Sequence, residues 1–242
     1  MEHAKRPAAP ASAGQTARAR ARAELTREIK EEARRQLAAE GAQRLSLRAV
    51  ARELGMVSSA LYRYFPSRDD LLTALIIDAY NALGAAAEEA AAQASAGGFR
   101  RRWHACAAAA RGWAIAHPHE YALIYGSPVP GYQAPAETIA PAGRVALVLG
   151  ALVADAWQAA PAALPAPPPL PGQLAAQAKT VADIIAPGVP GPVVARALIA
   201  WTQLFGMISF ELFGQLVGSA DPADDFFGYA VDQMADLIGL PA

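Results

Sequence analysis

The sequence has a single cysteine, Cys106, among its 242 residues. One thiol cannot form an internal disulfide or a cysteine-rich metal site, so we expect a reducing, cytoplasmic compartment. Aromatic residues make up only 7% of the chain and charged residues 18%, whereas hydrophobic residues make up 54%. Many of the hydrophobic residues are alanine, the strongest helix former. The composition therefore excludes a globally disordered chain and predicts an all-α fold.

Long uninterrupted hydrophobic runs are also lacking. The basic N-terminus is followed by Ala-Arg-rich sequence with no apolar segment, which argues against a secretory signal. The stretch 192–218 is apolar enough to resemble a membrane helix, but polar residues, which are costly in lipid, interrupt it. These are Arg196, Gln203, Glu211 and Gln215. We interpret the stretch as a buried bundle helix and expect no membrane partner.

Motifs of catalysis and metal binding are missing too. The chain has no Gly-x-Ser-x-Gly elbow, no phosphate-binding loop and no dinucleotide glycine set. The run His117-Pro118-His119-Glu120 superficially suggests a metal, but its proline forbids a regular i, i+4 pair of histidines and no further ligand cluster completes a shell. We predict no enzyme activity, no catalytic residues, no cofactor and no metal.

The net charge of −1 hides an uneven distribution. Residues 1–72 carry 14 Lys and Arg against 9 Asp and Glu, a net charge of +5, whereas residues 73–242 carry 7 against 13, a net charge of −6. A basic segment joined to an acidic one is typical of a module that meets nucleic-acid phosphates, attached to one that does not. Codon bias toward arginine gives a similar excess, so the charge supports DNA binding without establishing it.

The N-terminal segment predicts a helix-turn-helix domain over 19–72, preceded by a disordered basic arm over 1–18. An amphipathic first helix is expected over 20–40. Ser46 is a good N-cap for a short second helix, and Gly55 permits a tight turn. A short third helix then runs to about Tyr64, and Ser67 caps a long fourth helix. Short helices this close together can bury their apolar faces only against one another.

Residues 73–242 predict a larger helical domain. A Pro-rich stretch over 161–172 is interpreted as an exposed loop. Asp221 as N-cap and Pro222 as first residue are expected to begin the last helix. The helices are expected over 99–116, 119–125, 141–158, 173–186, 193–217 and 222–238.

The segment from Ser46 to Leu72 closely resembles the signature of the TetR family of transcriptional repressors. The run Leu61-Tyr62-Arg63-Tyr64-Phe65 begins six residues after Gly55, and Arg68 then opens the fourth helix. The resemblance covers about Glu24 to Leu72. It implies a repressor that binds a palindromic operator in double-stranded DNA.

The resemblance also implies which residues contact DNA. Ser46 and Arg48, at the start of the second helix, would contact phosphate. Residues 57–59 would contact base edges. The two tyrosines after them and Arg68 would bind the DNA backbone. Val57 stands where the family often has a serine cap, and favours contact with a thymine methyl group. As an alternative to DNA contact, the tyrosines could pack in the core. Arg48 and Arg52 could simply belong to a solvated helix face. The full set is Ser46, Arg48, Val57, Ser58, Ser59, Tyr62, Arg63, Tyr64 and Arg68.

The C-terminal half resembles a TetR subfamily named for a Trp-His-Gly motif. It has a comparable His117-Pro118 pair and a Gly-x-Pro-x-Pro run from Gly126, but Phe205 replaces the motif's histidine. Large aromatic residues are hypothesised to line an apolar pocket for a small-molecule effector, with simple core filling as the alternative. They are Trp103, Trp113, Tyr121, Tyr125, Trp157, Trp201 and Phe205.

Apolar stripes on the last two helices predict a homodimer joined by a four-helix seam. The stripes include Ile208, Leu212, Phe227, Met234, Leu237 and Ile238. A two-fold dimer presents two recognition helices to half-sites about 34–36 Å apart, and effector binding is expected to lower operator affinity by linkage. Two alternatives stay open: a helical small-molecule-binding protein without DNA function, and a TetR-type activator. An all-helical enzyme is disfavoured because no catalytic constellation is present.

Overall fold

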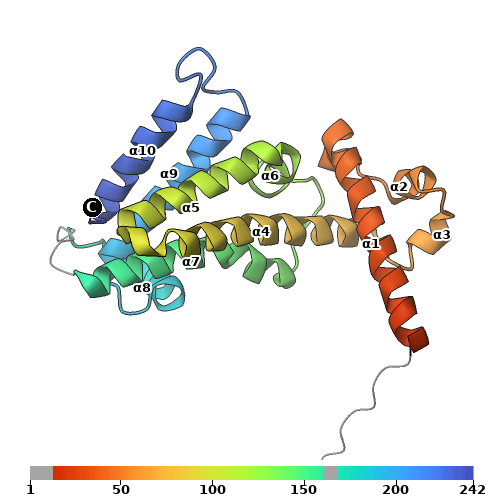
Figure 1. The fold of residues 1–242 in the computed structure, drawn as a ribbon, viewed down its shortest axis with the longest axis horizontal. Helices are drawn as coiled ribbons and strands as arrows, with labels where there is room; N and C mark the ends of the chain where they lie inside the picture. Colours follow the sequence, from red (N-terminus) through yellow and green to blue (C-terminus); the bar gives the residue numbers. More distant parts are fainter. Residues whose placement is uncertain (1–12, 161–167, 242) are drawn as a thin grey trace, which may run out of the picture. The chain divides into compact units, whose positions relative to one another are not determined.

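The computed structural model describes residues 13–160 and 168–241. Within these ranges the chain forms helices and connecting turns without a strand, which confirms the all-α prediction. The chain divides into two compact units, Met1–Ala74 (unit 1) and Leu75–Ala242 (unit 2), and the division falls inside one long helix. The helices, labelled in Figure 1, are α1 (Ala13–Glu40), α2 (Leu47–Glu53), α3 (Ser58–Leu61), α4 (Arg68–Gln93), α5 (Gly98–Ala116), α6 (Pro118–Tyr125), α7 (Ile139–Ala159), α8 (Gly172–Ile185), α9 (Gly191–Leu212) and α10 (Asp224–Ile238).

In unit 1, the short helices α2 and α3 pack on each other, and α2 packs on α1. Helix α1 begins at Ala13, so residues 13–18 are helical although the sequence predicted an arm there; residues 1–12 lie outside the described residues. Helix α3 ends at Leu61, earlier than expected, and a turn continues to Tyr64. The core of the unit includes Ile29, Ala33, Leu37, Leu47, Val50, Leu61 and Phe65.

In unit 2, α5 lies at the centre and packs on α7, α9 and α10, while α8 packs on α7 and α9. Figure 1 shows α9 and α10 side by side next to α5. Cys106 is buried within this bundle, and burial raises the pKa of its thiol to about 11, so the thiol stays protonated at neutral pH. The largest buried side chains of this core are Trp103, Tyr121, Leu83, Leu152, Leu204, Ile208 and Met234.

Two helix boundaries in unit 2 differ from the sequence prediction. Helix α9 ends at Leu212, and residues 213–219 form turns in which Gly214 and Gly218 adopt positive φ. Helix α10 begins at Asp224 with Ala223 as its N-cap, so Asp221 and Pro222 precede the helix. In the expected Pro-rich loop, residues 161–167 lie outside the described residues, and α8 begins at the last position of that loop.

By length and composition, three helices could cross a membrane: α4, α7 with the turn before it, and α9. Each also contributes buried side chains to the helical core. Leu83 of α4, Leu152 of α7 and Leu204 of α9 all belong to the same buried cluster. Their apolar surface is therefore used, at least in part, for packing within the chain.

A mostly buried arginine joins three helices of unit 2. Arg111 on α5 forms a bidentate pair with Glu211 on α9, with N···O distances of 2.7 and 2.6 Å. Its third nitrogen binds Asp224 of α10 at 2.9 Å, and its guanidinium lies 4.8 Å from the ring centre of Phe227. The side chains of Arg111 and Glu211 are 14% and 19% exposed. Because water screens this pair poorly, losing one partner leaves an uncompensated charge.

We predict that Arg111→Met lowers the free energy of unfolding by about 1–3 kcal/mol, because the Glu211 carboxylate loses its partner while remaining mostly buried. Urea denaturation followed by circular dichroism measures the change. The control is Arg101→Met, which removes a charge from the exposed side of the same helix and should change stability by less than about 0.5 kcal/mol. Equal stability of the two variants would contradict a structural role for the Arg111 pair.

Candidate DNA-binding site

The second helix begins as the sequence predicted. The Ala49 N–H donates to Ser46 Oγ at 3.4 Å, and Ser46 has the extended backbone typical of an N-cap. Leu47 and Val50 point into the core of unit 1, whereas Arg48 is exposed. The side chain of Ser46 is therefore occupied by capping, and Arg48 is available to an external partner.

The turn between α2 and α3 depends on Gly55. This residue has φ +64°, a left-handed conformation that costs other residues about 1–2 kcal/mol. The Met56 N–H donates to the Ala51 carbonyl at 2.8 Å and so closes the end of α2. The four residues between α2 and α3 redirect the chain, which brings α3 back against α2.

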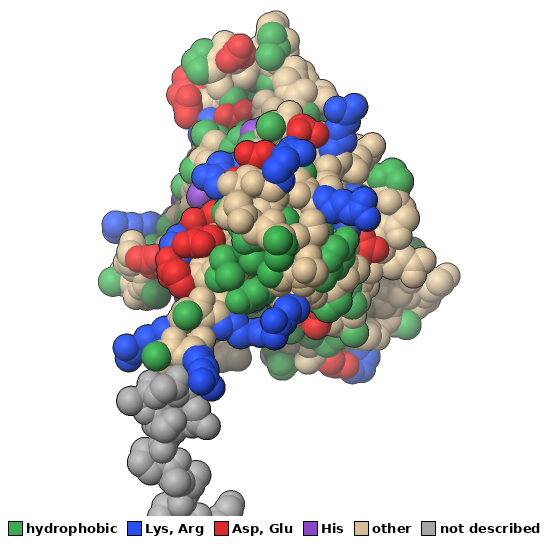
Figure 2. Space-filling model, turned by 90° about the vertical axis from the view of Figure 1, so that its right-hand side faces the viewer, with side chains coloured by type: hydrophobic (Ala, Val, Ile, Leu, Met, Phe, Trp, Pro, Cys, Tyr) green, Lys and Arg blue, Asp and Glu red, His purple; other side chains and the backbone are tan. Residues whose placement is uncertain are grey.

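Helix α3 has one anchored face and one open face. Leu61 is fully buried and Phe65, just beyond the helix, is 7% exposed, so both fix this segment to the core of unit 1. Val57 is 70% exposed and provides no side-chain cap, and Ser59 is also exposed. Figure 2 looks onto the side that carries α2 and α3, and shows apolar side chains with both basic and acidic side chains around them.

The turn after α3 carries the remaining predicted contacts. Tyr62 is 42% exposed and Arg63 is exposed, whereas Tyr64 is half-buried. The guanidinium of Arg22 on α1 lies 5.1 Å from the ring centre of Tyr64 and donates to the Arg63 carbonyl at 3.4 Å. Sequence reasoning missed Arg22, because nothing in its local pattern says that it reaches a residue 41 positions away.

Arg68 makes contacts within unit 1 that the sequence did not predict. Its guanidinium donates to three backbone carbonyls of the connection between α1 and α2: Ala42 at 2.8 Å, Leu45 at 3.2 Å and Gln43 at 3.4 Å. A further nitrogen pairs with Asp69 at 3.4 Å. Most of its donors are therefore used within unit 1, and Arg68 holds the start of α4 against that connection.

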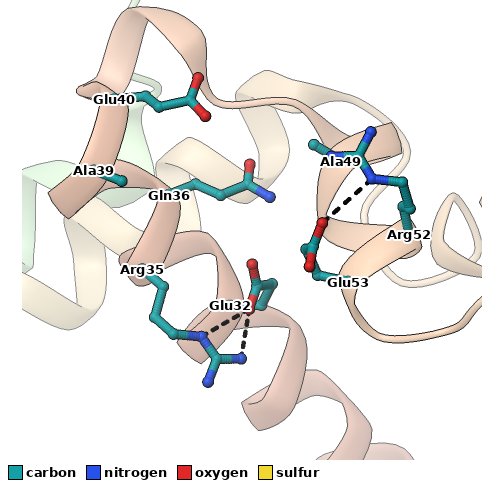
Figure 3. A pocket seen from close by; sticks show the side chains of 8 residues that line it. All are labelled: Glu32, Arg35, Gln36, Ala39, Glu40, Ala49, Arg52 and Glu53. Atoms are coloured by element: carbon teal, nitrogen blue, oxygen red, sulfur yellow. Dashed lines mark hydrogen bonds and ion pairs between the residues drawn. The ribbon is translucent and has the colours of Figure 1, made fainter.

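Between α1 and α2 lies a polar hollow of about 500 Å³, drawn in Figure 3. Its charged groups pair locally: Arg35 with Glu32, and Arg52 with Glu53 at 3.2 Å. Glu40 adds a third carboxylate to the lining. Carboxylates outnumber guanidinium groups here, so the hollow does not attract a phosphate, and Arg52 belongs to this paired surface.

In unit 2, two of the predicted pocket residues serve as core. The indole N–H of Trp103 donates to the Val231 carbonyl at 3.0 Å, and its side chain is 1% exposed. The buried Tyr121 hydroxyl donates to the Phe205 carbonyl at 2.9 Å and lies 2.9 Å from Ser209 Oγ. Burial raises the pKa of Tyr121 to about 12. The polar atoms of both side chains therefore have hydrogen-bond partners within the core, which hold the rings in place.

Three further predicted residues form a continuous aromatic cluster. The rings of Tyr125 and Phe205 stack with centroids 4.4 Å apart, and Trp201 meets Phe205 edge-on at 5.8 Å. Tyr80 of α4 meets Tyr125 edge-on at 6.2 Å and donates its hydroxyl to the Ile124 carbonyl at 3.3 Å. Burial raises the pKa of Tyr125 above its ordinary value. Phe205, which replaces the histidine of the subfamily motif, is thus a stacking residue.

The remaining two predicted aromatic residues are not part of this cluster. Trp113 packs on His117 with ring centroids 5.3 Å apart, and His117 Nδ1 lies 3.1 Å from a carboxylate oxygen of Glu120. Trp157 is half-buried at the edge of the core of unit 2. These two residues therefore lie apart from the cluster of Tyr125, Phe205 and Trp201.

A small apolar cavity does lie between Trp103 and Trp201, bounded by α5, α7, α8 and α9. Its volume is about 20 Å³, little more than the roughly 10–15 Å³ that one water molecule requires. The indole nitrogen of Trp201 is buried and has no hydrogen-bond partner among the described residues. A buried N–H without a partner costs about 1–3 kcal/mol.

The predicted dimer residues lie mostly inside the protomer. Ile208, Phe227, Met234 and Ile238 are all at most 7% exposed, and Leu212 and Leu237 are half-buried. The apolar stripes of α9 and α10 therefore pack on each other and on α5 within one chain. The exposed apolar residues lie elsewhere on these helices and the turns between them, at Ile199, Phe210, Phe213, Val217, Phe226 and Tyr229.

Comparison with known proteins identifies both units. Residues 29–75 match the family model described as bacterial regulatory proteins, tetR family, and residues 103–234 match the tetracyclin repressor-like, C-terminal domain. The chain is 42% identical over 211 residues to the HTH-type transcriptional regulator Rv1816 of Mycobacterium tuberculosis (strain ATCC 25618 / H37Rv), covering 81% of this chain and 83% of that protein.

Solved structures show a similar fold. The protein SCO4313 is 34% identical with a TM-score of 0.74, covering 90% of this chain and 98% of that one. A protein of unknown function from Rhodococcus sp. RHA1 is 27% identical with a TM-score of 0.67, covering 90% and 96%. The chain belongs to the tetR family of bacterial regulatory proteins, and is a DNA-binding transcriptional regulator, not an enzyme.

Proposed function

We propose that this regulator is a cytoplasmic repressor that binds a palindromic operator as a homodimer and releases it when a small apolar or aromatic effector binds unit 2. The observation that carries the DNA-binding part is the two-sided arrangement of α3. Leu61 and Phe65 fix one side, while Val57, Ser59 and Tyr62 face outward. An anchored helix with a free convex face is what entry into a major groove requires.

The exposed groups of this face suit different parts of DNA. The Val57 side chain fits against a thymine methyl group, and the Ser59 hydroxyl can donate to or accept from a base edge. Tyr62, Arg63 and Arg48 offer a phenol and two cations for phosphate oxygens. The net charge of +5 over residues 1–72 favours the approach of any duplex.

Homodimerisation is supported by an exposed stripe along α9. Ile199, Gln203, Gly206 and Phe210 recur at helical spacing and all face solvent, with Ile199 and Phe210 more than half exposed. An apolar hollow of about 320 Å³ lies on this surface, and Gly206 and Phe226 are part of its lining. Exposed apolar surface of this kind marks interaction sites, and a two-fold axis would bring two copies of the stripe together.

A route from effector to operator is supported by α4, which crosses from unit 1 into unit 2. At its start, Arg68 binds the carbonyls of the α1–α2 connection. Further along, Arg144 of α7 forms a bidentate pair with Glu88 at 2.8 and 2.6 Å and binds Asn81 at 2.9 Å. Gly84 lies against the Arg144 side chain, where an added Cβ would sit 2.7 Å from the Arg144 Cβ. In this proposal, a displacement of α4 in unit 2 is carried along the helix to its first turn.

The DNA-binding proposal is tested by selecting duplexes from a random pool with the full-length protein. We expect an inverted repeat whose half-sites lie about 34–36 Å apart, and binding that weakens as salt increases. Val57→Ala should weaken the selected duplex by roughly 5- to 150-fold, the equivalent of about 1–3 kcal/mol, and relax preference at a single base pair. Fluorescence anisotropy measures the affinity.

The matched control is Ile184→Ala, which shortens a similarly exposed side chain (66%) on α8 and should leave DNA affinity unchanged. Both substitutions are on the surface and should change stability by no more than about 0.5 kcal/mol. If the wild-type protein selects no sequence, or if Val57→Ala binds as tightly as the control, the recognition role of α3 is rejected.

The dimer proposal predicts that Phe210→Glu converts the protein to a monomer, because two carboxylates would be buried against apolar surface at the two-fold axis. Light scattering after size exclusion gives the mass directly. Ile184→Glu, which adds the same charge at an exposed site on α8 away from the stripe, should remain a dimer. A dimeric Phe210→Glu protein would place the interface elsewhere.

The effector proposal predicts that an apolar ligand carrying one hydrogen-bond acceptor enlarges the cavity at Trp201 and satisfies its indole N–H. Titration of intrinsic tryptophan fluorescence with a panel of aromatic alcohols and carboxylic acids measures binding. A responding ligand should lose most of its effect in Trp201→Phe, whereas Trp157→Phe, at the edge of the core, should retain it. No response from the whole panel would reject this cavity as the effector site.

A further inference from the structure

The N-terminal turns of α1 extend beyond the packed part of unit 1. Residues 17–24 are all exposed, and the first buried side chain of the helix is Ile29. From Ala13 to Glu24 the helix extends about 16 Å at 1.5 Å per residue. Because residues 17–24 bury no side chain, packing among the described residues does not explain why the helix continues through them.

Its charge also differs from that of the rest of the helix. Residues 17–23 alternate alanine with Arg18, Arg20 and Arg22, and no acidic residue occurs from 13 to 23. Farther along, the arginines are neutralised: Arg27 pairs with Glu24 and Glu31, and Arg35 pairs with Glu32. Among the residues that the structure describes, Arg18 and Arg20 have no ion pair.

Arg22 shows which face of this segment lies near the recognition helix. Its guanidinium covers the Tyr64 ring at 5.1 Å and donates to the Arg63 carbonyl at 3.4 Å. Both partners directly follow α3, in the turn whose exposed side chains are proposed to contact phosphate. The α1 segment is therefore attached to the edge of the proposed DNA surface inside unit 1.

Arg18 lies on the same face as Arg22, one turn nearer the N-terminus. Residues at i and i+4 are neighbours on a helix, and four residues correspond to about 6 Å along the axis. Arg20 is rotated by about 200° from Arg18 and shares the opposite face with Glu24. Two like charges at i and i+4 disfavour the helix by about 0.2–0.5 kcal/mol, so an anionic partner on the Arg18 face would stabilise it.

We infer that the Arg18/Arg22 face of α1 is a second DNA-contacting element, which binds phosphates of the duplex beside the half-site occupied by α3. The inference rests on the proposed DNA-binding function. The partner is the sugar-phosphate backbone because guanidinium groups at this spacing meet phosphates without needing a particular base. In Figure 2, Lys and Arg side chains gather at the lower end of the view, where the N-terminal helix begins.

The test compares Arg18→Ala with Arg20→Ala in the full-length protein. Both remove one positive charge from the same exposed helix and replace it with the best helix former, but only the first removes it from the face shared with Arg22. Affinity for a selected duplex is measured by fluorescence anisotropy between 50 and 300 mM salt, roughly the range over which phosphate contacts dominate.

For Arg18→Ala we expect the slope of log K against log salt to fall in magnitude by about 0.9 per subunit, or about 1.8 for a dimer. Arg20→Ala should retain the wild-type slope to within about 0.3, and Arg18→Lys, which keeps the charge, should bind within about twofold of the wild type. Preference among duplex sequences should be unchanged in all three.

The outcomes separate this inference from the proposed function. If the wild-type protein binds DNA but Arg18→Ala and Arg20→Ala have the same slope, the α1 contact is wrong and the role of α3 stands. If the wild-type protein binds no duplex, both proposals fail. Binding to phosphatidylserine vesicles that depends on Arg18, without a change in the DNA slope, would assign the face to a membrane surface and overturn the inference.

Discussion

A helix of one turn is not stable in water, because its few internal hydrogen bonds do not offset the entropy lost on ordering it. Helix α3 has only four residues, so its existence depends on Leu61 and Phe65, which tie it to the core of unit 1. The same constraint gives the helix its use: with one face anchored, Val57 and Ser59 on the other face are held in fixed positions. Proposed base contacts therefore depend on apolar packing beneath them.

Much of unit 1 could be predicted from sequence because its signals are local. Ser46 caps α2, Gly55 adopts positive φ, and Ser67 Oγ accepts from the Asp70 N–H at 3.1 Å at the start of α4. Each signal is set by residues within four positions. The partner of Arg68 is different, since only the folded chain brings the Ala42 carbonyl, 26 positions away, to within 2.8 Å. The carbonyl partners of Arg68 were therefore not predictable from its local sequence.

The face that α9 presents to the outside was not predictable, because the helix is apolar on nearly all sides. Ile208 and Phe210 have similar hydrophobicity, yet the first is fully buried and the second is 55% exposed. Periodicity assigns an inward face only where polar residues mark the opposite one. The apolar stripe of α10 was predicted correctly from periodicity, but its side chains pack against α5 and α9 within the protomer. A sequence pattern does not distinguish a partner helix in the same chain from one in a second copy.

The aromatic residues of unit 2 connect the effector proposal to α4. Tyr125, Phe205 and Trp201 already fill the space between them by stacking, so the cavity at Trp201 accommodates little more than one water molecule. A larger ligand must displace aromatic rings, and interiors this densely packed transmit such displacement instead of absorbing it. Tyr80 of α4 is the next ring in contact with Tyr125. Movement of the Trp201 ring would therefore reach α4 through three ring contacts, and α4 begins at Arg68, which binds the connection that precedes α2.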